Sequence, residues 1–209
     1  MDYKIYDTLR QRILFMEYPP GTILNEKTLA AEFGLSRSPI RDVLNRLEWA
    51  GLVRVIPRTG TLVSEVEFRK MMEVYQVRLE IEGLVGRMAA EQITDGHLDQ
   101  IRETAEECRK LFSDRNRRRL IGVDMKFRLV MYDAANNEPL KEISQHLYDQ
   151  TLRVWFSFFD RSDWRVEVQG MLDEITQTHQ VLASRAPLEA ARVRQHFLQN
   201  YLDRLKGKF

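Results

Sequence analysis

Residues 19–63 read PPGTILNEKTLAAEFGLSRSPIRDVLNRLEWAGLVRVIPRTGTLV, and this stretch decides the fold of the first part of the chain. Apolar residues recur at helical spacing twice, over residues 29–33 and again over residues 40–47. Two short apolar segments then flank a turn at residues 57–60. Two short helices followed by a β hairpin form a winged helix-turn-helix, the arrangement that places a helix in the major groove of DNA.

Residues that favour helix ends mark the boundaries of these two helices. Asn25 and Ser36 can each accept a hydrogen bond from a backbone N–H at a helix start. Gly34 and Gly51 suit the positions just beyond a helix, where glycine is preferred. We therefore expect one helix between Asn25 and Gly34 and a recognition helix between Ser36 and Gly51. The wing strands are expected at residues 52–56 and 61–64.

The polar face of the recognition helix and the tip of the wing carry the candidate DNA contacts. A recognition helix contacts bases with its N-terminal residues, which here are Arg37, Ser38 and Arg41. Arginine is the side chain that binds guanine through O6 and N7. Arg58 at the wing tip is suited to lie against the phosphate backbone. Residues 27–58 hold six cations and three anions, a local charge of +3, whereas the whole chain carries only +1.

This stretch resembles the GntR-type bacterial transcription regulators. The resemblance lies in the PPG at residues 19–21, the SRSPIR at 36–41, the AGL at 50–52 and the GT of the wing at 60–61. Asn25 stands where Ser or Pro is more usual, and Lys27 where Arg is common, but the cap and the charge are kept. The resemblance implies DNA contacts at Lys27, Arg37, Ser38, Arg41, Thr59 and Gly60.

The composition is that of an ordinary globular protein, with 44% hydrophobic and 30% charged residues in a chain of 209. Cys108 is the single cysteine, so no intramolecular disulfide can form, as is usual in a reducing cytoplasm. Residues 1–12 lack the apolar core of a signal peptide. No run approaches the ~20 apolar residues that span a bilayer. We therefore expect a cytoplasmic protein with no membrane partner.

After residue 64 the pattern changes to long amphipathic helices. They are expected at residues 68–92, 95–113, 117–135, 140–159, 164–184 and 187–206, with a break at 136–139. Helices of this number and length form an all-α bundle. The chain is therefore expected to be mostly α. We assign residues 1–66 to the winged helix-turn-helix and residues 67–209 to an all-α domain that binds an effector and forms a dimer.

The helical part resembles the FadR/FCD subgroup of GntR-type regulators, whose FCD domain (fatty-acid-regulator C-terminal domain) binds ligands. The resemblance lies in the helix at residues 75–91, in DMKFR at 124–128, in the break at 134–140 and in His179 and His196. In the subgroup, one Asp and three His bind a divalent metal such as Zn or Ni, and a carboxylate effector completes the coordination. The resemblance therefore implies metal ligands at Asp124, His179 and His196.

Arg128 departs from this pattern, because it occupies the position of the first His and a guanidinium cannot be a metal ligand. Three interpretations stay open. Arg128 can replace the metal charge and bind an anionic ligand bidentately. Asp124, His179 and His196 can still hold a metal as three protein ligands. Arg128 can also simply pair with Asp124, which lies one helical turn away.

Arg78 and Arg153 are the other candidates for binding an effector. Arg78 lies mid-helix in an apolar context, and family members often use this position to hold the effector carboxylate. Its alternative role is an ion pair with Glu82, four residues further along. Arg153, within LRVWF, is placed to point inward. With Arg128, these residues define the expected carboxylate site.

A metabolite-responsive DNA-binding regulator is thus the expected function. We expect a repressor that binds a pseudo-palindromic operator as a homodimer and responds to a small organic carboxylate. The alternative is an enzyme in which a metal held by the helical domain activates water. The sequence contains no HExxH, no GxSxG and no glycine-rich phosphate loop, so the regulator is preferred over the enzyme.

Overall fold

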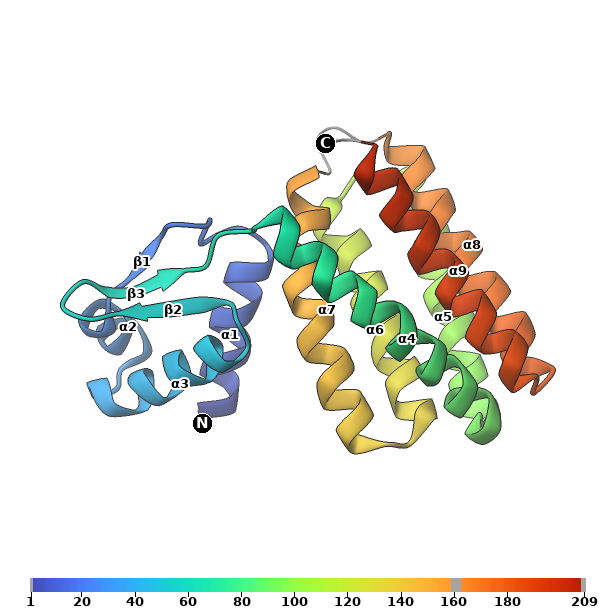
Figure 1. The fold of residues 1–209 in the computed structure, drawn as a ribbon, viewed down its shortest axis with the longest axis horizontal. Helices are drawn as coiled ribbons and strands as arrows, with labels where there is room; N and C mark the ends of the chain where they lie inside the picture. Colours follow the sequence, from blue (N-terminus) through green and yellow to red (C-terminus); the bar gives the residue numbers. More distant parts are fainter. Residues whose placement is uncertain (1, 159–162, 208–209) are drawn as a thin grey trace. The chain divides into compact units, whose positions relative to one another are not determined.

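The computed structural model describes residues 2–158 and 163–207, and in these ranges it contains nine helices and three strands (Figure 1). The chain divides into two compact units. The first comprises residues 1–74 and 146–158, and the second comprises residues 75–145 and 159–209. Two helices, α4 (Phe68–Gln92) and α7 (Glu138–Phe158), therefore begin in one unit and end in the other. The predicted domain boundary at residues 66–67 stays a prediction.

The helix-turn-helix consists of α2 (Glu26–Phe33) and α3 (Arg37–Trp49). Both helices begin and end close to the predicted residues. The Asn25 side chain accepts hydrogen bonds from two backbone N–H groups of α2, and Gly34 ends that helix with a φ of +66°. Such a cap is worth about 1 kcal/mol. Ser36 occupies the cap position of α3, but its side chain makes no capping hydrogen bond.

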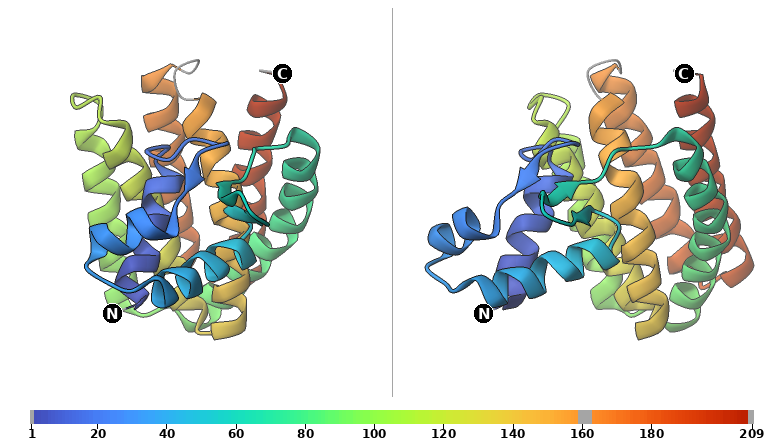
Figure 2. Two further views of the ribbon diagram at one scale, coloured as in Figure 1. Left: turned by 90° about the vertical axis from the view of Figure 1, so that its left-hand side faces the viewer. Right: turned by 60° about the vertical axis from the view of Figure 1, so that its left-hand side comes forward.

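The apolar stripe of α3 is buried as predicted, and it packs against a helix that the sequence reasoning did not assign. The buried residues of α3 are Ile40, Val43, Leu44 and Leu47. They face α1 (Asp2–Leu14), whose Leu9 and Ile13 are fully buried. Figure 2 shows α1 lying beside α3 in both views. The first unit is thus a three-helix core that presents the opposite face of α3 to solvent.

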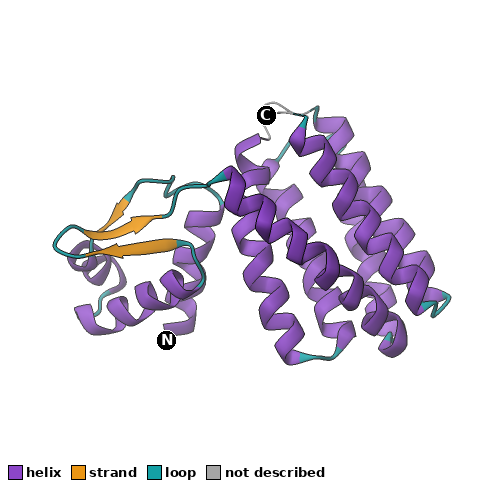
Figure 3. Ribbon diagram, in the orientation of Figure 1, coloured by secondary structure: helices purple, strands orange, loops and turns teal. Residues whose placement is uncertain are grey.

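All three strands lie in the first unit, as Figure 3 shows. The sheet has the order β1-β3-β2 and is antiparallel, with β1 at Ile23–Leu24, β2 at Val53–Ile56 and β3 at Gly60–Val63. The hairpin formed by β2 and β3 is the predicted wing. The two-residue strand β1 was not predicted, because a pair of residues carries no alternation of polarity to recognise.

The end of α7 completes the first unit. Asp149 accepts two hydrogen bonds from the guanidinium of Arg10 on α1, and both side chains are buried. The rings of Phe15 and Phe156 meet edge to face, with centroids 6.3 Å apart. Residues 146–158 therefore belong structurally with the winged helix-turn-helix, although 80 residues separate them in sequence from the end of the wing linker at about residue 66.

The second unit is all-helical, as predicted. Besides parts of α4 and α7, it contains α5 (Asp95–Lys110), α6 (Arg117–Ala135), α8 (Trp164–Ala183) and α9 (Pro187–Lys206). Helix α5 packs on α6 and α8, and α8 packs on α9. The predicted helix boundaries agree to within a few residues. Across the described residues, no helix combines the length and apolar character that a membrane span requires.

Two glycines bring α4 and α9 close together. A Cβ atom added at Gly86 would lie 2.6 Å from the carbonyl oxygen of Ala190 and 2.7 Å from Cγ of Arg194. A Cβ at Gly83 would lie 2.8 Å from the side chain of Gln195. Atoms do not pack at such distances, and the contact at Gly86 requires glycine because it involves backbone atoms, whereas the Gln195 side chain near Gly83 is able to shift. The close approach carries Arg194 toward the buried face of α4.

Candidate nucleic-acid interface and effector site

The seven residues predicted to contact DNA are all exposed in the first unit. They lie at the start of α2, along the first turns of α3 and at the tip of the wing: Lys27, Arg37, Ser38, Arg41, Arg58, Thr59 and Gly60. The buried stripe of α3 fixes the helix from the opposite side. This arrangement leaves the N-terminal end of α3 open to a ligand with a negatively charged surface.

Arg41 is held by a carboxylate that the sequence reasoning did not single out. Its Nε and Nη2 donate to Oε1 and Oε2 of Glu26 over 3.0 and 2.9 Å. The hydrogen bond from Arg41 is the main cause that lowers the pKa of Glu26. Glu26 is the first residue of α2, where a negative charge is favoured by the helix dipole. A phosphate or base edge that contacts Arg41 must therefore compete with Glu26.

The wing tip is a tight turn that fixes the direction of Arg58. The backbone N–H of Thr59 donates to the carbonyl of Ile56 over 3.1 Å, so Pro57 and Arg58 form the centre of the turn. Arg58 has a φ of +66°, in the left-handed region that non-glycine residues avoid at a cost of about 1–2 kcal/mol. Gly60 follows with a φ of +124°. A strained residue at an exposed tip is typical of a functional position.

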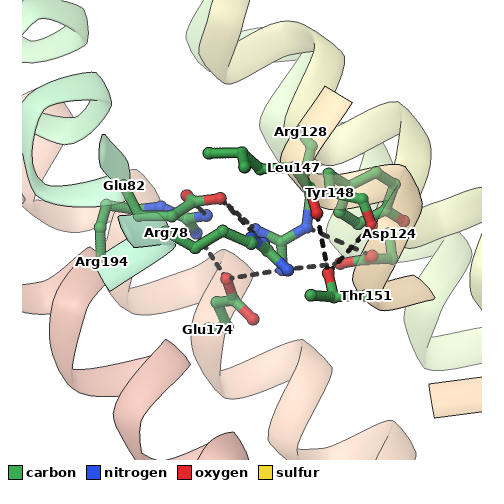
Figure 4. Close-up of polar contacts among 9 residues, drawn as sticks. All are labelled: Arg78, Glu82, Asp124, Arg128, Leu147, Tyr148, Thr151, Glu174 and Arg194. Atoms are coloured by element: carbon green, nitrogen blue, oxygen red, sulfur yellow. Dashed lines mark hydrogen bonds and ion pairs between the residues drawn. The ribbon is translucent and has the colours of Figure 1, made fainter. Parts of the chain in front are cut away.

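A buried network of charges lies in the second unit (Figure 4). It joins side chains of α4, α6, α8 and α9: Arg78, Glu82, Asp124, Arg128, Glu174 and Arg194. Three guanidinium groups meet three carboxylates, so the formal charge of the set is zero. Of these side chains, only Glu174 is more than about a tenth exposed.

Glu82 lies at the centre of the network. Its Oε1 accepts from Nη2 of Arg78 over 3.0 Å and from Nη1 of Arg128 over 3.3 Å. Its Oε2 accepts from Nη2 of Arg194 over 2.6 Å. Burial by itself would raise the pKa of Glu82, but the charges of the three arginines outweigh it and lower the pKa below the usual value. Glu82 is therefore held ionised.

Two more carboxylates complete the network around Arg128 and Arg194. Nη2 of Arg128 lies 3.1 Å from Oδ1 of Asp124 and 3.5 Å from Oε1 of Glu174. Nη1 of Arg194 donates to Oε1 of Glu174 over 2.5 Å. Burial lowers the pKa of each arginine, and the surrounding carboxylates raise it by more, so both pKa values end above the usual one. Each of these two cations is thus fully compensated within the unit.

Buried polar groups near the network offer further hydrogen-bonding capacity. Within the described part of the chain, the hydroxyls of Tyr132 and Thr178 and Nε of Arg194 are buried without a hydrogen-bond partner. Burial raises the pKa of Tyr132, and the charge of Glu82 raises it further while the three arginines of the network lower it, so this hydroxyl lies within electrostatic reach of the network. Buried groups of this kind usually have a partner, so these three retain hydrogen-bonding capacity that the described contacts do not use.

The expected metal ligands are not brought together. His196 is exposed on α9, and its Nε2 lies 2.8 Å from Nδ2 of Asn200. Asp124 is engaged by Arg128, and His179 is half-buried on α8. In residues 2–158 and 163–207, no three His, Cys, Asp or Glu side chains are grouped so as to hold a metal ion. The residues present therefore do not fit the metal centre that the resemblance implied.

The structure corrects the expected lining of the effector site. Arg78 and Arg128 both contact Glu82. The two ion pairs considered as alternatives to effector binding, Arg78 with Glu82 and Arg128 with Asp124, are both formed. His196 lies outside the network, and Arg194 takes the inward position on α9 instead. The sequence held a signal for this, because Arg194 falls between Ala190 and Leu198 in the buried stripe of α9. Arg153 lies in the first unit.

Comparisons with known proteins agree with both parts of the chain. Residues 3–63 match the bacterial regulatory proteins of the gntR family, and residues 73–200 match the FCD domain. YdhC, an uncharacterized HTH-type transcriptional regulator of Bacillus subtilis (strain 168), is 28% identical over 147 residues, or 70% of this chain and 66% of the relative. The HTH-type transcriptional repressor RspR of Escherichia coli (strain K12) is 26% identical over 160 residues, or 77% of this chain and 70% of the relative. The chain thus spans about two thirds of the length of these relatives.

A solved structure shares the fold over the whole chain. The structure of E. coli McbR/YncC superposes with a TM-score of 0.88, covering 99% of this chain and 97% of the other at 21% identity. At this identity the likeness concerns the fold. It includes both the small winged sheet and the all-helical part.

Proposed function

Because the chain belongs to the GntR family of bacterial regulatory proteins and carries an FCD domain, we propose that it is a cytoplasmic repressor that binds a pseudo-palindromic operator as a homodimer and responds to a small carboxylate. The observation that carries the proposal is the exposed set of Arg37, Arg41 and Arg58 on α3 and the wing. Arginines at these places can bind guanine edges and phosphates. The name of RspR states that this relative is a repressor, which supports repression rather than activation as the proposed activity.

A dimer is favoured by the size of the DNA-binding module. One recognition helix and one wing make a small interface, whereas specific DNA complexes usually bury more surface. A two-fold dimer supplies two such modules and matches a palindromic site whose halves lie about one helical turn apart. The local charge of +3 over residues 27–58 is then doubled. The helical unit is the proposed site of dimerisation.

The carboxylate effector is proposed to act at the buried network of the second unit. Arg78 and Arg128 both donate to Oε1 of Glu82, so a carboxylate of similar shape can replace that oxygen. The buried hydroxyl of Tyr132, on which the charge of Glu82 acts, is a further donor that the described contacts do not use. Such a ligand would displace the Glu82 carboxylate from Arg78 and Arg128, and would not bind to an arginine that lacks a carboxylate neighbour. It changes DNA affinity only as far as it prefers one arrangement of the unit.

DNA binding is tested by measuring retardation of a fragment from upstream of the protein's own gene. Arg37→Ala should lower the affinity about tenfold or more and relax specificity at one base pair. Arg102→Ala is the matched control, because this arginine of α5 is 65% exposed and lies in the helical unit. Equal binding by the parent and Arg37→Ala would remove the proposed interface.

The effector proposal is tested by thermal unfolding with pyruvate, succinate and citrate. At least one carboxylate should raise Tm, and Arg128→Ala should abolish the rise while treatment with EDTA leaves it unchanged. A ligand response that survives replacement of both Arg78 and Arg128 would show that the network does not bind the effector. Light scattering on the full chain tests the dimer, and a monomer would contradict it.

A further inference from the structure

The recognition helix α3 and the wing are joined by a short segment whose conformation is fixed by backbone hydrogen bonds. The N–H of Gly51 donates to the carbonyl of Glu48 over 2.8 Å, and the N–H of Leu52 donates to the carbonyl of Leu47 over 3.0 Å. Gly51 has a φ of +71°, in the left-handed region that glycine adopts without strain. These two bonds and this φ form a Schellman motif, so α3 ends at a defined residue and the chain leads directly into β2.

A side-chain hydrogen bond ties the same end of α3 to the wing itself. Oε1 of the half-buried Glu48 accepts from the backbone N–H of Val55 over 2.6 Å. Val55 is the third residue of β2, and the strand order β1-β3-β2 places β2 at an edge of the sheet. The carboxylate of Glu48 therefore occupies an edge N–H that would otherwise be open to another strand. A hydrogen bond to a carboxylate is stronger than one between neutral groups.

The position of this bond makes it suited to set the direction of the wing. Val55 precedes Arg58 at the wing tip by three residues, so the bond holds the hairpin about 10 Å from its tip. On its other side the hairpin pairs with β1 over only two residues, Ile23 and Leu24. The Schellman motif fixes the start of β2 relative to α3, and Glu48 fixes its middle. A strand that is held at two points resists pivoting better than a strand that is held at one.

DNA binding by two elements depends on the distance and the angle between them. In the proposed function, on which the present inference rests, α3 contacts base edges and Arg58 contacts a phosphate. A protein that already holds the two elements at the spacing of the duplex loses less conformational freedom on binding. We propose that Glu48 is a positioning residue for DNA binding. It directs the wing so that Arg58 reaches a phosphate while Arg37 and Arg41 lie in the major groove.

The test compares variants of Glu48 in the full chain by retardation of the upstream DNA fragment. Glu48→Ala removes the acceptor and should weaken binding about five- to tenfold. Glu48→Asp keeps the charge, but its carboxylate is one methylene short of Val55, so binding should weaken to a similar degree. Glu48→Gln loses the charge and keeps an oxygen acceptor, so it should bind within about twofold of the parent. Asp42→Ala is the control for loss of an exposed carboxylate from α3, and it should not weaken binding.

A double-mutant cycle separates positioning from a role in stability alone. Arg58→Ala should weaken binding by the parent but should have little further effect in Glu48→Ala, because the misdirected wing no longer reaches its phosphate. Arg37→Ala should weaken binding by the same factor in both backgrounds. Ethylation interference should show loss of the wing phosphates in Glu48→Ala, with the contacts of α3 kept. If Glu48→Ala does not fold, Glu48→Asp takes its place in the cycle.

The outcomes distinguish a failure of this role from a failure of the proposed function. If Arg37→Ala and Arg58→Ala bind weakly while Glu48→Ala and Glu48→Asp bind like the parent, the positioning role alone is overturned. Additive effects of Glu48→Ala and Arg58→Ala would overturn it as well, and so would equal losses in Glu48→Gln and Glu48→Ala. Absence of retardation by the parent would overturn the proposed DNA binding and, with it, the role of Glu48.

Discussion

In the second unit, Arg128 and Arg194 are buried. Each of them contacts at least two carboxylates of the same unit, and at least one of these lies on another helix. In the first unit, Arg37 and Arg58 are exposed on α3 and the wing. The two sets have the same chemistry and opposite surroundings. A buried charge must be compensated inside the folded chain, because its desolvation costs several kcal/mol. An exposed charge can remain solvated until a phosphate replaces its water, which suits DNA binding.

The largest expected effect comes from removing the central carboxylate of the network. Glu82→Gln leaves three guanidinium groups around a neutral amide, so the free energy of unfolding should fall by about 3–5 kcal/mol. Glu80→Gln is the control, because Glu80 is exposed on the same helix. Its effect should stay within about 0.5 kcal/mol. Urea unfolding measures both. Equal stabilities for the two variants would show that the network contributes little.

The pH dependence of the free energy of unfolding, compared between the parent and Glu82→Gln, sharpens this test. The folded-state pKa of Glu82 is lowered from 4.5, so its contribution to stability is present above that value and is lost as the pH falls through the folded pKa. The difference in free energy of unfolding between the parent and Glu82→Gln should therefore be constant between neutral pH and about pH 5, and should shrink only in stronger acid. A difference that already shrinks near pH 6 would contradict the ionised state.

Replacing an exposed arginine of the first unit should change DNA binding rather than stability. Arg41→Ala should weaken operator binding about 5- to 150-fold while the unfolding transition stays in place. Glu26→Gln is the informative partner variant, because it removes the carboxylate that holds Arg41 and a negative charge beside the proposed DNA contact. It should tighten binding to all DNA sequences a few-fold. Weaker binding by Glu26→Gln would mean that Glu26 orients Arg41 for DNA and does not compete with it.

The packing that brings Arg194 to Glu82 can be tested through glycine. Gly86 lies one turn after Glu82, where α4 meets α9. Gly86→Ala should lower the free energy of unfolding by about 1–3 kcal/mol, because the new methyl group meets backbone atoms. Gly122→Ala on α6 is the matched control, since its Cβ meets no atom within 4 Å. There alanine should stabilise the helix by up to about 1 kcal/mol. Changes of the same sign would contradict the close approach.

The sequence was sufficient for the winged helix-turn-helix, because its features are local. The cap at Asn25, the glycine at Gly34 and the apolar stripe of α3 each act within one or two helical turns. The helices of the second part follow from periodicity in the same way. Helix α1 was not predicted, because residues 1–12 were considered only for the lack of an apolar core that a signal peptide requires.

The network could be predicted only in its local pairs. The pairs Arg78–Glu82 and Asp124–Arg128 are four residues apart and therefore visible in sequence. The contacts of Glu82 with Arg194 span 112 residues and depend on how α4 meets α9. Family resemblance directed attention to His196, which is exposed. Which residue of α9 points inward is decided by the register of its buried stripe, and that stripe contains Arg194.

The smallest expected effect separates stability from DNA binding at one residue. Arg58 has a positive φ at the wing tip, so Arg58→Gly should raise the free energy of unfolding by about 1 kcal/mol through relief of backbone strain. The same change removes the proposed phosphate contact and should weaken binding to all sequences alike, with a shallower salt dependence. Urea unfolding and retardation at two salt concentrations measure the two effects. Arg58→Lys is the control that keeps the charge and the strain. If Arg58→Gly bound DNA as well as Arg58→Lys, the cation at the wing tip would make no phosphate contact.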